Sequence, residues 1–574
     1  MSSDESSFGS NLDATAPFID TASSDAICDE EPVEEFDLIV IGGGIIGCGI
    51  ARDASLRGLR VVVVEKEDFS SGTSSRSTRL IHGGLRYLAM FDFGLVRQDL
   101  REREILLKTA PHRVRPLQFT VPFYNRSLWY RLRLRIGLLL YDLLSFGKSL
   151  PNHSFFSPAE TLRREPELAP EGLQGAAVYW DAQSPFVERL CLDNLVDAVR
   201  HGATAYNHTE VTGLPRDGSG RVCGVRVRDS LAGQERTLHA RVVVDATGPW
   251  LDRFENRVGT AQSRRLRLTK GIHFATPKCV DSALVLFAGR DERLFFVIPW
   301  LDSAWVGTTD TDFDDNLDTV RATGEDVRYL LETVSVLLPR AEWDRIHFTS
   351  AGVRALVRRG QSGSAESDVS RKHRVVIHSA ADGAEGLISV LGGKITAYRG
   401  IAEEVTDNAV RLLGSPAAAR YAACATAART LPGGEIPKGE ALLCAVRADS
   451  EPLGLTEEQA DRLALLYGSE YTEILALIRA HPELGSPLGP DYPEVRACVR
   501  YAVQQEFART LSDVMMRRTA LSFSPDQGLS AVGEVVQEMA GLLFWDAERI
   551  ADEIEHYRYQ VQLTQAFRAE MGVL

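Results

Sequence analysis

The sequence has no long apolar run, no Cys-x-x-Cys spacing and no excess of basic residues. A helix that crosses a bilayer needs about 20 apolar residues, whereas the most apolar segment, 128–144, is shorter and contains three arginines. The eight scattered cysteines argue against a disulfide framework and a zinc site, and they fit a reducing compartment. The net charge of −15 argues against a surface that binds nucleic acid. We therefore expect no membrane-spanning segment, no metal site and no nucleic-acid partner.

Part of the negative charge is local. Residues 1–35 contain ten acidic residues and neither lysine nor arginine. A secretory or transit peptide would be basic at its start, so this composition predicts a disordered acidic tail. With 574 residues, the chain is too long for one ordinary core, and two or three domains are expected.

Residues 36–65 carry the strongest local pattern. In order, they hold an apolar strand-like run (38–41), the glycines of G-x-G-x-x-G (Gly42, Gly44 and Gly47), a helical stretch (45–56), a second apolar run (61–64) and Glu65. This order and spacing are typical of a dinucleotide-binding fold. A lone glycine motif would be weak, but here each flanking element is also present.

Each part of this pattern has a physical task. Gly42 permits a tight turn, Gly44 lets the backbone approach a pyrophosphate, and Gly47 lets the helix pack on the strand. The N-terminus of the helix offers free N–H groups to the phosphates. Glu65 can accept hydrogen bonds from both hydroxyls of an adenosine ribose.

The next loop, 68–88, is rich in small hydroxyl residues and glycine, and it ends in His-Gly-Gly and Arg-Tyr. A solvent loop needs no such run, so we interpret it as a loop that crosses the cofactor. Its candidate residues are Thr73, Ser74, Ser77, His82, Gly83, Gly84, Arg86 and Tyr87. The segment 73–88 resembles the T-S-x-x-S-x-x-L-I-H-G-G-L-R-Y-L pattern of the FAD-dependent glycerol-3-phosphate dehydrogenases, which are flavoproteins similar to D-amino-acid oxidase.

Further motifs continue the resemblance. They are a strand-like segment ending at Val211, the A-T-G of 246–248 followed by Trp250, K-G-x-H at 270–273, G-V-R at 352–354, Arg371, and G-G-K-I-T at 392–396. The sequence also departs from the family. Ala355 replaces the usual proline, and Lys372 follows Arg371 where an acidic residue is common. Arg354 and Lys394 themselves match the family pattern, whereas Arg371 stands directly before a departure from it.

The resemblance implies an enzyme that binds FAD, oxidises glycerol 3-phosphate to dihydroxyacetone phosphate and passes electrons to a membrane quinone. The implied catalytic residues are His82, His273, Lys394 and Arg354, and the implied substrate-binding residues are Arg86, Tyr87, Arg354, Arg371 and Lys394. The implied cofactor-binding residues are Gly42, Gly44, Gly47, Glu65, Thr73, Ser74, Ser77, Gly83, Gly84, Val211, Gly248, Trp250, Gly393, Lys394, Ile395 and Thr396.

Several alternatives stay open at this point. The acceptor is either quinone or O₂, and a related flavin-dependent amino- or hydroxy-acid dehydrogenase would share the fold. Several arginines fit a dianionic phosphate better than a lone carboxylate. A non-catalytic scaffold would not need His82, Arg354 and Lys394. We also expect a homodimer that is cytoplasmic and peripherally bound to the cytoplasmic face of the membrane.

The predicted fold class is α/β, with a Rossmann-like FAD-binding domain of the glutathione-reductase and D-amino-acid-oxidase type. A mixed-sheet substrate domain and an all-helical C-terminal domain accompany it. Residues 36–112, 175–260 and 350–412 are assigned to the FAD-binding domain. The other parts are the tail (1–35), a substrate- or membrane-facing segment (113–174), the substrate domain (261–349), a linker (413–433) and the helical domain (434–574).

Two segments lead to predictions about surfaces. The apolar, arginine-bearing segment 128–144 is either a buried helix or an element that lies in the lipid interface. In 501–520, apolar residues and charged residues recur at helical spacing. This pattern predicts one helix whose charges form a solvated, salt-bridged face.

Overall fold

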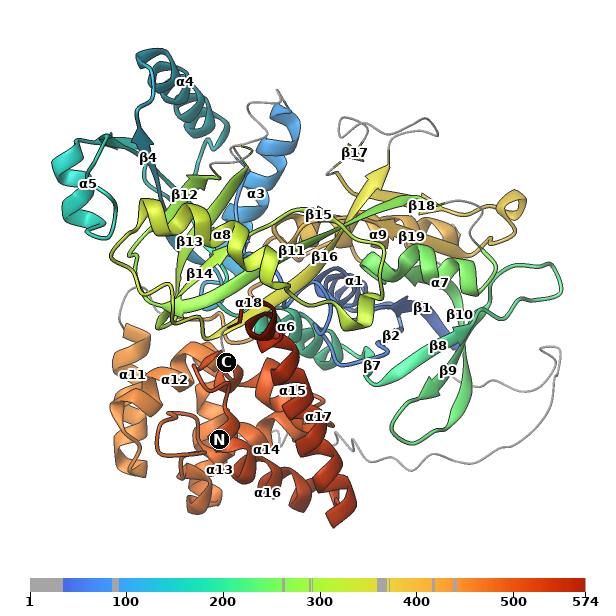
Figure 1. The fold of residues 1–574 in the computed structure, drawn as a ribbon. Coiled ribbons are helices and arrows are strands. Elements are labelled where there is room, and N and C mark those ends of the chain that lie inside the picture. The colour runs from blue at the N-terminus through green and yellow to red at the C-terminus, as the bar shows by residue number, and fades with distance from the viewer. Residues whose placement is uncertain are drawn as a thin grey trace, which may run out of the picture.

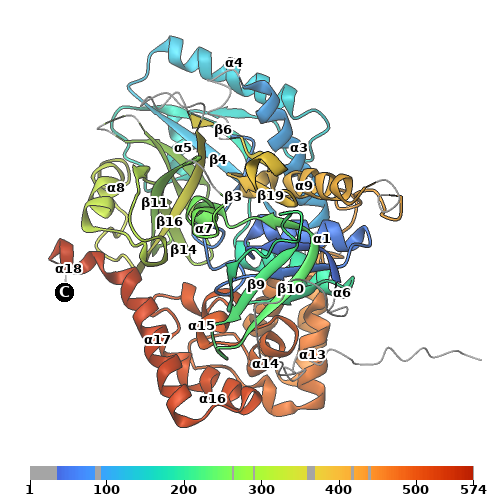
Figure 2. The same ribbon diagram turned by 90° about the vertical axis from the view of Figure 1, so that its right-hand side faces the viewer.

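In this computed structural model, residues 35–84, 92–260, 264–288, 291, 293–358, 369–370, 372–414, 419–436 and 441–572 are described. The predicted site residues Arg86, Tyr87 and Arg371 lie outside these ranges. Figures 1 and 2 show two β-sheets side by side, with a group of helices from the C-terminal part of the chain packed beneath them.

The first sheet has eight strands and is built around the glycine-rich segment. Its strands are β1 (Glu35–Ile41), β2 (Val61–Val64), β7 (Thr204–Tyr206), β8 (Thr209–Gly213), β9 (Gly224–Asp229), β10 (Glu235–Asp245), β18 (Arg374–Ile377) and β19 (Leu387–Leu391). The path through it runs β18-β19-β10-β1-β2-β7, and β9 and β8 extend from β10. Strand β1 pairs in parallel with both β10 and β2, as a Rossmann-type fold requires.

Helices cover one face of this sheet because its central strands are apolar on both faces. Helices α1 (Ile45–Leu56), α6 (Val187–Arg200) and α9 (Tyr398–Leu413) share one core with β1, β2 and β10. The other face packs against β8, β9 and helix α7 (Leu251–Arg257). The strand–glycine–helix–strand order predicted for 36–65 is confirmed, with the helix at the predicted bounds.

The second sheet has eleven strands and mixed pairing. Its strands are β3 (Leu80–Ile81), β4 (Arg115–Tyr124), β5 (Ser154–Phe156), β6 (Leu173–Gln183), β11 (Leu266–Pro277), β12 (Ala283–Phe287), β13 (Leu294–Trp300), β14 (Ser303–Gly307), β15 (Thr311–Asp312), β16 (Phe348–Arg358) and β17 (Val369–Ser370). Four helices accompany it: α3 (Phe93–Thr109), α4 (Leu128–Leu144), α5 (Pro158–Arg164) and α8 (Gly324–Leu337). The chain passes back and forth between the two sheets, so residues far apart in sequence meet between them.

The C-terminal part is helical, as predicted. Its helices are α11 (Ala441–Ser450), α12 (Glu457–Tyr467), α13 (Tyr471–Ala480), α14 (Arg496–Gln505), α15 (Leu511–Asp513), α16 (Val532–Leu543), α17 (Ala547–Gln565) and α18 (Phe567–Met571). Together with the two sheets, this region confirms the predicted α/β class with a mixed sheet and a helical C-terminal region.

The prediction of a single helix over 501–520 is wrong. Helix α14 ends at Gln505, Phe507 has a positive φ of 61°, and a π-helical turn, Val514–Arg518, follows α15. The predicted solvated face is also wrong, since Glu506 and Asp513 are buried. Glu506 pairs with Arg189 of α6, and Asp513 pairs with His208 between β7 and β8. These ion pairs replace the hydration of the buried charges, and forming them stabilises the protein more than a continuous helix would.

Helix α4 has the predicted bounds, but the buried-helix alternative is wrong. Only Leu138 and Tyr141 are buried. Figures 1 and 2 both place α4 at the end of the molecule opposite the C-terminal helices. In the part of the chain that the structure describes, no helix has both the length and the apolar content needed to cross a bilayer.

Candidate functional site

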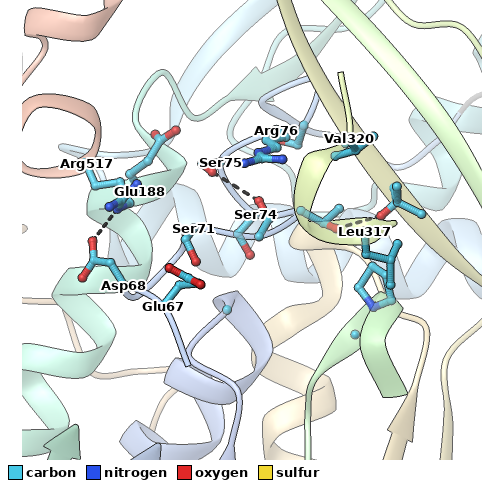
Figure 3. Close-up of a pocket in the computed structure, with 18 of the residues that line it drawn as sticks. Glu67, Asp68, Ser71, Ser74, Ser75, Arg76, Glu188, Leu317, Val320 and Arg517 are labelled. Atoms are coloured by element: carbon cyan, nitrogen blue, oxygen red, sulfur yellow. Dashed lines mark hydrogen bonds and ion pairs between the residues drawn. The ribbon is translucent and has the colours of Figure 1, made fainter. Parts of the chain in front are cut away.

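A cavity of about 1230 Å³ lies between the two sheets and reaches the C-terminal helices. It is lined by the glycine loop after β1, the hydroxyl-rich loop 71–78, the strands β11 and β16 of the second sheet, and helix α17. Figure 3 shows part of this lining, with Ser74 at its centre and Arg517 of the C-terminal part at one side.

The glycine loop has the geometry that close backbone contact requires. Gly42 has a φ of +102°, and a Cβ there would lie 2.7 Å from the carbonyl oxygen of Ala246. A Cβ on Gly47 would lie 1.9 Å from the carbonyl oxygen of Gly42. Gly44 faces the cavity, and among the described residues a Cβ there would come near Ser74 Oγ alone, at 3.3 Å. The backbone at the start of α1 is therefore open to an anionic group.

Glu65 ends β2 at the edge of the cavity. Its carboxylate accepts hydrogen bonds from the backbone N–H groups of Gly43, at 2.7 Å, and Glu67, at 3.0 Å. Burial raises the pKa of Glu65. Val211, Gly248 and Trp250 line the cavity with it. The structure thus brings Glu65, which the sequence analysis assigned to an adenosine ribose, together with three more of the implied cofactor-binding residues.

The hydroxyl-rich loop is fixed by helix α1 and by the second sheet. Thr73 donates from Oγ1 to the carbonyl oxygen of Val353 at 2.7 Å, and Ser74 Oγ accepts the N–H of Ile45 at 3.0 Å. Trp305 donates from its indole nitrogen to the carbonyl oxygen of Ser77 at 3.3 Å. Thr73, Ser74 and Ser77 all line the cavity, as predicted, and two of their hydroxyls also hold the protein together.

His273 is fully enclosed on the cavity wall of β11. Its ring stacks on Trp305, with centroids 5.2 Å apart, and Nε2 lies 3.0 Å from Thr78 Oγ1. Nδ1 has no hydrogen-bond partner among the described residues. Burial, followed by the positive charges of Arg354 and Arg79, lowers the pKa of His273 well below its usual value. The imidazole is therefore neutral.

His82 lies where the loop after β3 meets the turn before α9. Its backbone N–H donates to Thr396 Oγ1 at 3.2 Å, and its Nδ1 accepts the N–H of Gly84 at 3.2 Å. His82, Gly393, Lys394, Ile395 and Thr396 all line the cavity. The predicted helix start near 395 is confirmed, because a 3-10 turn, Ile395–Ala397, leads into α9.

Lys394 has a partner that the sequence analysis missed. Its Nζ donates to Oδ2 of Asp99, on α3, at 2.7 Å. Burial raises the pKa of Asp99 to about 6, although the charge of Lys394 opposes the shift. Asp99 lies 295 residues from Lys394 in a charged helix. No local signal marks it.

Arg354 lies on the same side of the second sheet as His273. Its guanidinium donates to Thr308 Oγ1 at 2.7 Å and to Asp310 Oδ1 at 3.1 Å. Space for it is made by Gly271, where a Cβ would lie 2.2 Å from Arg354 Nη2. Arg354 is only partly buried and lines the cavity.

Two predicted cofactor contacts lie elsewhere. Gly83 and Gly84 are not among the residues that line the cavity. A Cβ on Gly83 would collide with Leu100 and with the hydroxyl of Tyr141. The glycine at 83 is thus required for packing against α3 and α4. Thr78, whose hydroxyl contacts His273, was not predicted.

Two known protein families together match most of this chain. The family described as FAD dependent oxidoreductase matches residues 37–399, and the C-terminal domain of alpha-glycerophosphate oxidase matches residues 424–550. A glycerol-3-phosphate dehydrogenase from Synechocystis sp. is 39% identical over 537 residues, covering 91% of this chain and 95% of that protein. An aerobic glycerol-3-phosphate dehydrogenase from Staphylococcus saprophyticus is 33% identical, covering 89% of this chain and 91% of that protein.

A solved structure agrees. The glycerol-3-phosphate dehydrogenase from Bacillus halodurans, complexed with FAD, superposes with a TM-score of 0.75 at 29% identity, covering 92% of this chain and 95% of that one. The residues present here fit the same cofactor, because the open glycine loop, Glu65 and a cavity between two sheets suit a long dinucleotide. The cofactor is FAD, and the chain belongs to the family of FAD-dependent glycerol-3-phosphate dehydrogenases.

Proposed function

We propose that this protein oxidises sn-glycerol 3-phosphate to dihydroxyacetone phosphate and delivers the electrons to a membrane quinone. One observation supports this most directly. A neutral, enclosed imidazole, His273, and a forked guanidinium, Arg354, face one cavity from neighbouring strands. An alcohol oxidation needs a proton acceptor, and a phosphate ester needs a cationic clamp.

Each residue has a defined task in this reaction. Arg354 binds the phosphate through two N–H groups and so fixes the position of C2. His273 accepts the hydroxyl proton at a ring nitrogen, and the bound FAD supplies the acceptor for the hydride of C2. Lys394, held by Asp99, stabilises negative charge on the substrate oxygen. His82 is the second candidate base. Arg86, Tyr87 and Arg371 remain predicted substrate contacts.

The quinone acceptor is supported by the surface of α4. Leu128, Trp129, Leu132, Ile136, Leu139 and Leu143 are exposed on it, and Phe146 follows. Arg133 and Arg135 are exposed beside them. Such a surface fits the lipid interface, where apolar side chains enter the headgroup region and arginines meet anionic lipids. We therefore propose peripheral contact with the cytoplasmic face of the membrane through α4. The homodimer stays a prediction.

Anaerobic mixing with glycerol 3-phosphate tests the reaction. We expect rapid loss of the flavin absorbance with glycerol 3-phosphate and little with glycerol. Reoxidation by a quinone analogue should be much faster than by O₂. Equal oxidation of glycerol and glycerol 3-phosphate would contradict the phosphate clamp, and fast reoxidation by O₂ alone would assign an oxidase instead.

The base is tested separately. Replacing His273 by asparagine should slow flavin reduction by about 100-fold or more, the usual range for loss of a general base. Because the asparagine side chain still fills part of the space beside Trp305, binding should change less than rate. His82→Asn serves as the comparison. Unchanged rapid-reaction traces in both variants would remove histidine from the mechanism.

A further inference from the structure

Arg76 lies in the middle of the hydroxyl-rich loop and lines the cavity. Among the described residues, its guanidinium makes no hydrogen bond or ion pair, whereas the next arginine along the loop, Arg79, pairs with Glu188. Its nearest charged neighbours include another cation, Arg517, and two carboxylates, Asp318 and Glu67. Burial and the charge of Arg517 lower the pKa of Arg76, so its charge is poorly compensated.

Three carboxylates of this region are already engaged by other side chains. Asp68 accepts from both Arg517 and Arg518, and Asp513 accepts from Arg517 and His208. Asp318 accepts from Lys66 and from the indole of Trp250. Glu67 lies at the exposed end of the cavity. The cations around Asp68 and Asp513 therefore outnumber the anions, and the region has a place for an anionic ligand.

A metal ion does not fit beside Asp68 and Asp513, because cationic side chains already occupy their carboxylates. Atoms of Asp68, His208 and Asp513 lie within 4.8 Å of one another, as metal ligands would. However, Asp68 pairs with the guanidiniums of Arg517 and Arg518. Asp513 pairs with His208 and with Arg517. A cation placed among them would meet several positive charges at short range. The excess charge calls for an anion, and this trio forms an ion-pair network.

The position of the loop relates Arg76 to the start of α1. Ser74, two residues before Arg76, accepts the N–H of Ile45 in the first turn of α1. On the other side, the backbone of Arg76 rests on Gly352 of β16, where a Cβ would lie 2.7 Å from the carbonyl oxygen of Arg76. Figure 3 shows Arg76 on the same stretch of loop as Ser74, with Arg517 across the pocket. The backbone is thus held at two points, and the side chain extends into the cavity.

We propose that Arg76 binds the pyrophosphate of FAD from the side opposite the N-terminus of α1, and that Arg517 reinforces it from the C-terminal region. A helix N-terminus offers N–H groups to one set of phosphate oxygens. A guanidinium fork neutralises the other set and adds directional hydrogen bonds. The C-terminal region thereby contributes to cofactor binding, through Arg517 directly and through Arg518, which fixes Asp68 at the start of the loop.

Two measurements on the full-length chain test this. Calorimetry of the apoprotein with FAD should show at least about tenfold weaker binding for Arg76→Gln, because charge-assisted hydrogen bonds to a phosphate are lost. Arg76→Lys should restore only part of the affinity, since the charge remains but the fork is lost. In the FAD-loaded protein, ³¹P NMR should show a changed shift of the pyrophosphate signals in both variants.

Arg221→Gln is the matched control. Arg221, in the segment between β8 and β9, is also partly buried and pairs with Glu385, but it does not line the cavity. The Arg221→Gln variant loses the same charge as Arg76→Gln but away from the cavity. Its FAD affinity and its ³¹P signals should therefore match those of the parent.

The proposal requires both effects in the Arg76 variants. Weaker binding with unchanged ³¹P signals would mean a general distortion of the loop and would overturn it. Unchanged FAD affinity would overturn it as well. If the FAD-loaded parent binds inorganic pyrophosphate and Arg76→Gln does not, Arg76 serves a separate anion and the proposal is wrong.

Discussion

In two regions of this molecule, the usual arrangement of exposed charged side chains and buried apolar side chains is reversed. Where the C-terminal helices meet the first sheet, Asp68, His208, Asp513 and Arg518 are all buried. On α4 and just after it, the reverse holds, and large apolar side chains face outward, with Trp129 exposed by 67% and Phe146 by 96%. Charged residues are rarely buried unless they are paired, and a large exposed apolar patch marks an interaction site.

The difference lies in where the partner is. Each of these four charged residues pairs with a counter-charge from another part of the same chain, so their contact is a completed interface. Among the described residues, α4 packs on the second sheet through Leu138 and Tyr141, with Tyr130, Leu134, Leu140 and Leu144 partly buried beside them, and its exposed apolar side chains belong to no core cluster. Substitutions in the completed interface should lower the stability of the folded protein. Substitutions on the exposed face of α4 should weaken only its association with a partner or a membrane. Four sets of substitutions test this contrast, and each is expected to have a smaller effect than the one before it.

Arg518→Ala should have the largest effect. Arg518 is fully buried, and it donates to both carboxylate oxygens of Asp68 and to the carbonyl oxygen of Glu506. Removing one partner of a buried pair leaves an uncompensated charge and costs about 3–5 kcal/mol. Thermal unfolding should show a midpoint many degrees lower, together with easier loss of FAD.

The control for this variant is Arg447→Ala, in α11 of the same helical region. Arg447 also pairs with two carboxylates, Asp461 and Glu457, but it is exposed. Solvent screens such pairs, so the unfolding midpoint should stay at the parent value. Equal losses in the two variants would show that burial is not what distinguishes the two ion pairs.

This region also shows the limit of sequence reasoning. The G-x-G-x-x-G turn and α1 were predicted because all their determinants lie within 30 neighbouring residues. In contrast, Asp513 pairs with His208 across 305 residues, and Lys394 pairs with Asp99 across 295. Helical spacing in 501–520 was real, but partners from another part of the fold decided the backbone. Local patterns cannot carry that information.

The second prediction uses two neighbouring leucines of α4. Leu138 is fully buried and Leu139 is 63% exposed. Leu138→Ala should cost about 2–5 kcal/mol of stability, because it opens a cavity in the core. Leu139→Ala should change stability by less than about 0.5 kcal/mol. Only Leu139→Ala should weaken binding to anionic vesicles while leaving the folded protein intact.

Flotation with vesicles measures the second part of this prediction. Binding should also weaken with salt and be lost when Arg131, Arg133 and Arg135 are all replaced by glutamate. Activity with a soluble artificial acceptor should survive these changes, whereas quinone reduction should fall. If the triple variant still floats with vesicles, α4 is not the docking surface.

Asp99→Asn gives the third effect, which depends on pH. Burial raises the pKa of Asp99 to about 6 in the folded protein, above its usual value of 3.8. The folded state thus favours the protonated form, and the stability linked to this group is lost as pH rises from about 4 through 6. The difference in unfolding midpoint between the parent and Asp99→Asn should shift against the parent across this range. A constant difference would show that Asp99 titrates normally.

The smallest effect is expected at His208, on the completed interface. Burial alone would lower the pKa of His208, but Asp513, at 3.0 Å, and then Asp68 outweigh it, and the net pKa is raised above 6.5 despite the opposing charge of Arg517. The folded state therefore favours the charged imidazole. The stability that this charge provides is fully present below pH 6.5 and is lost as pH rises through the raised pKa.

His208→Gln keeps a hydrogen-bond donor without the charge, so its unfolding midpoint should fall less between about pH 6 and 9 than that of the parent. Parallel curves for the two proteins would mean that His208 is neutral at this interface. In that case, the ion pairs of Asp68 with Arg517 and Arg518 and of Arg189 with Glu506 would still supply charged contacts between the C-terminal region and the first sheet.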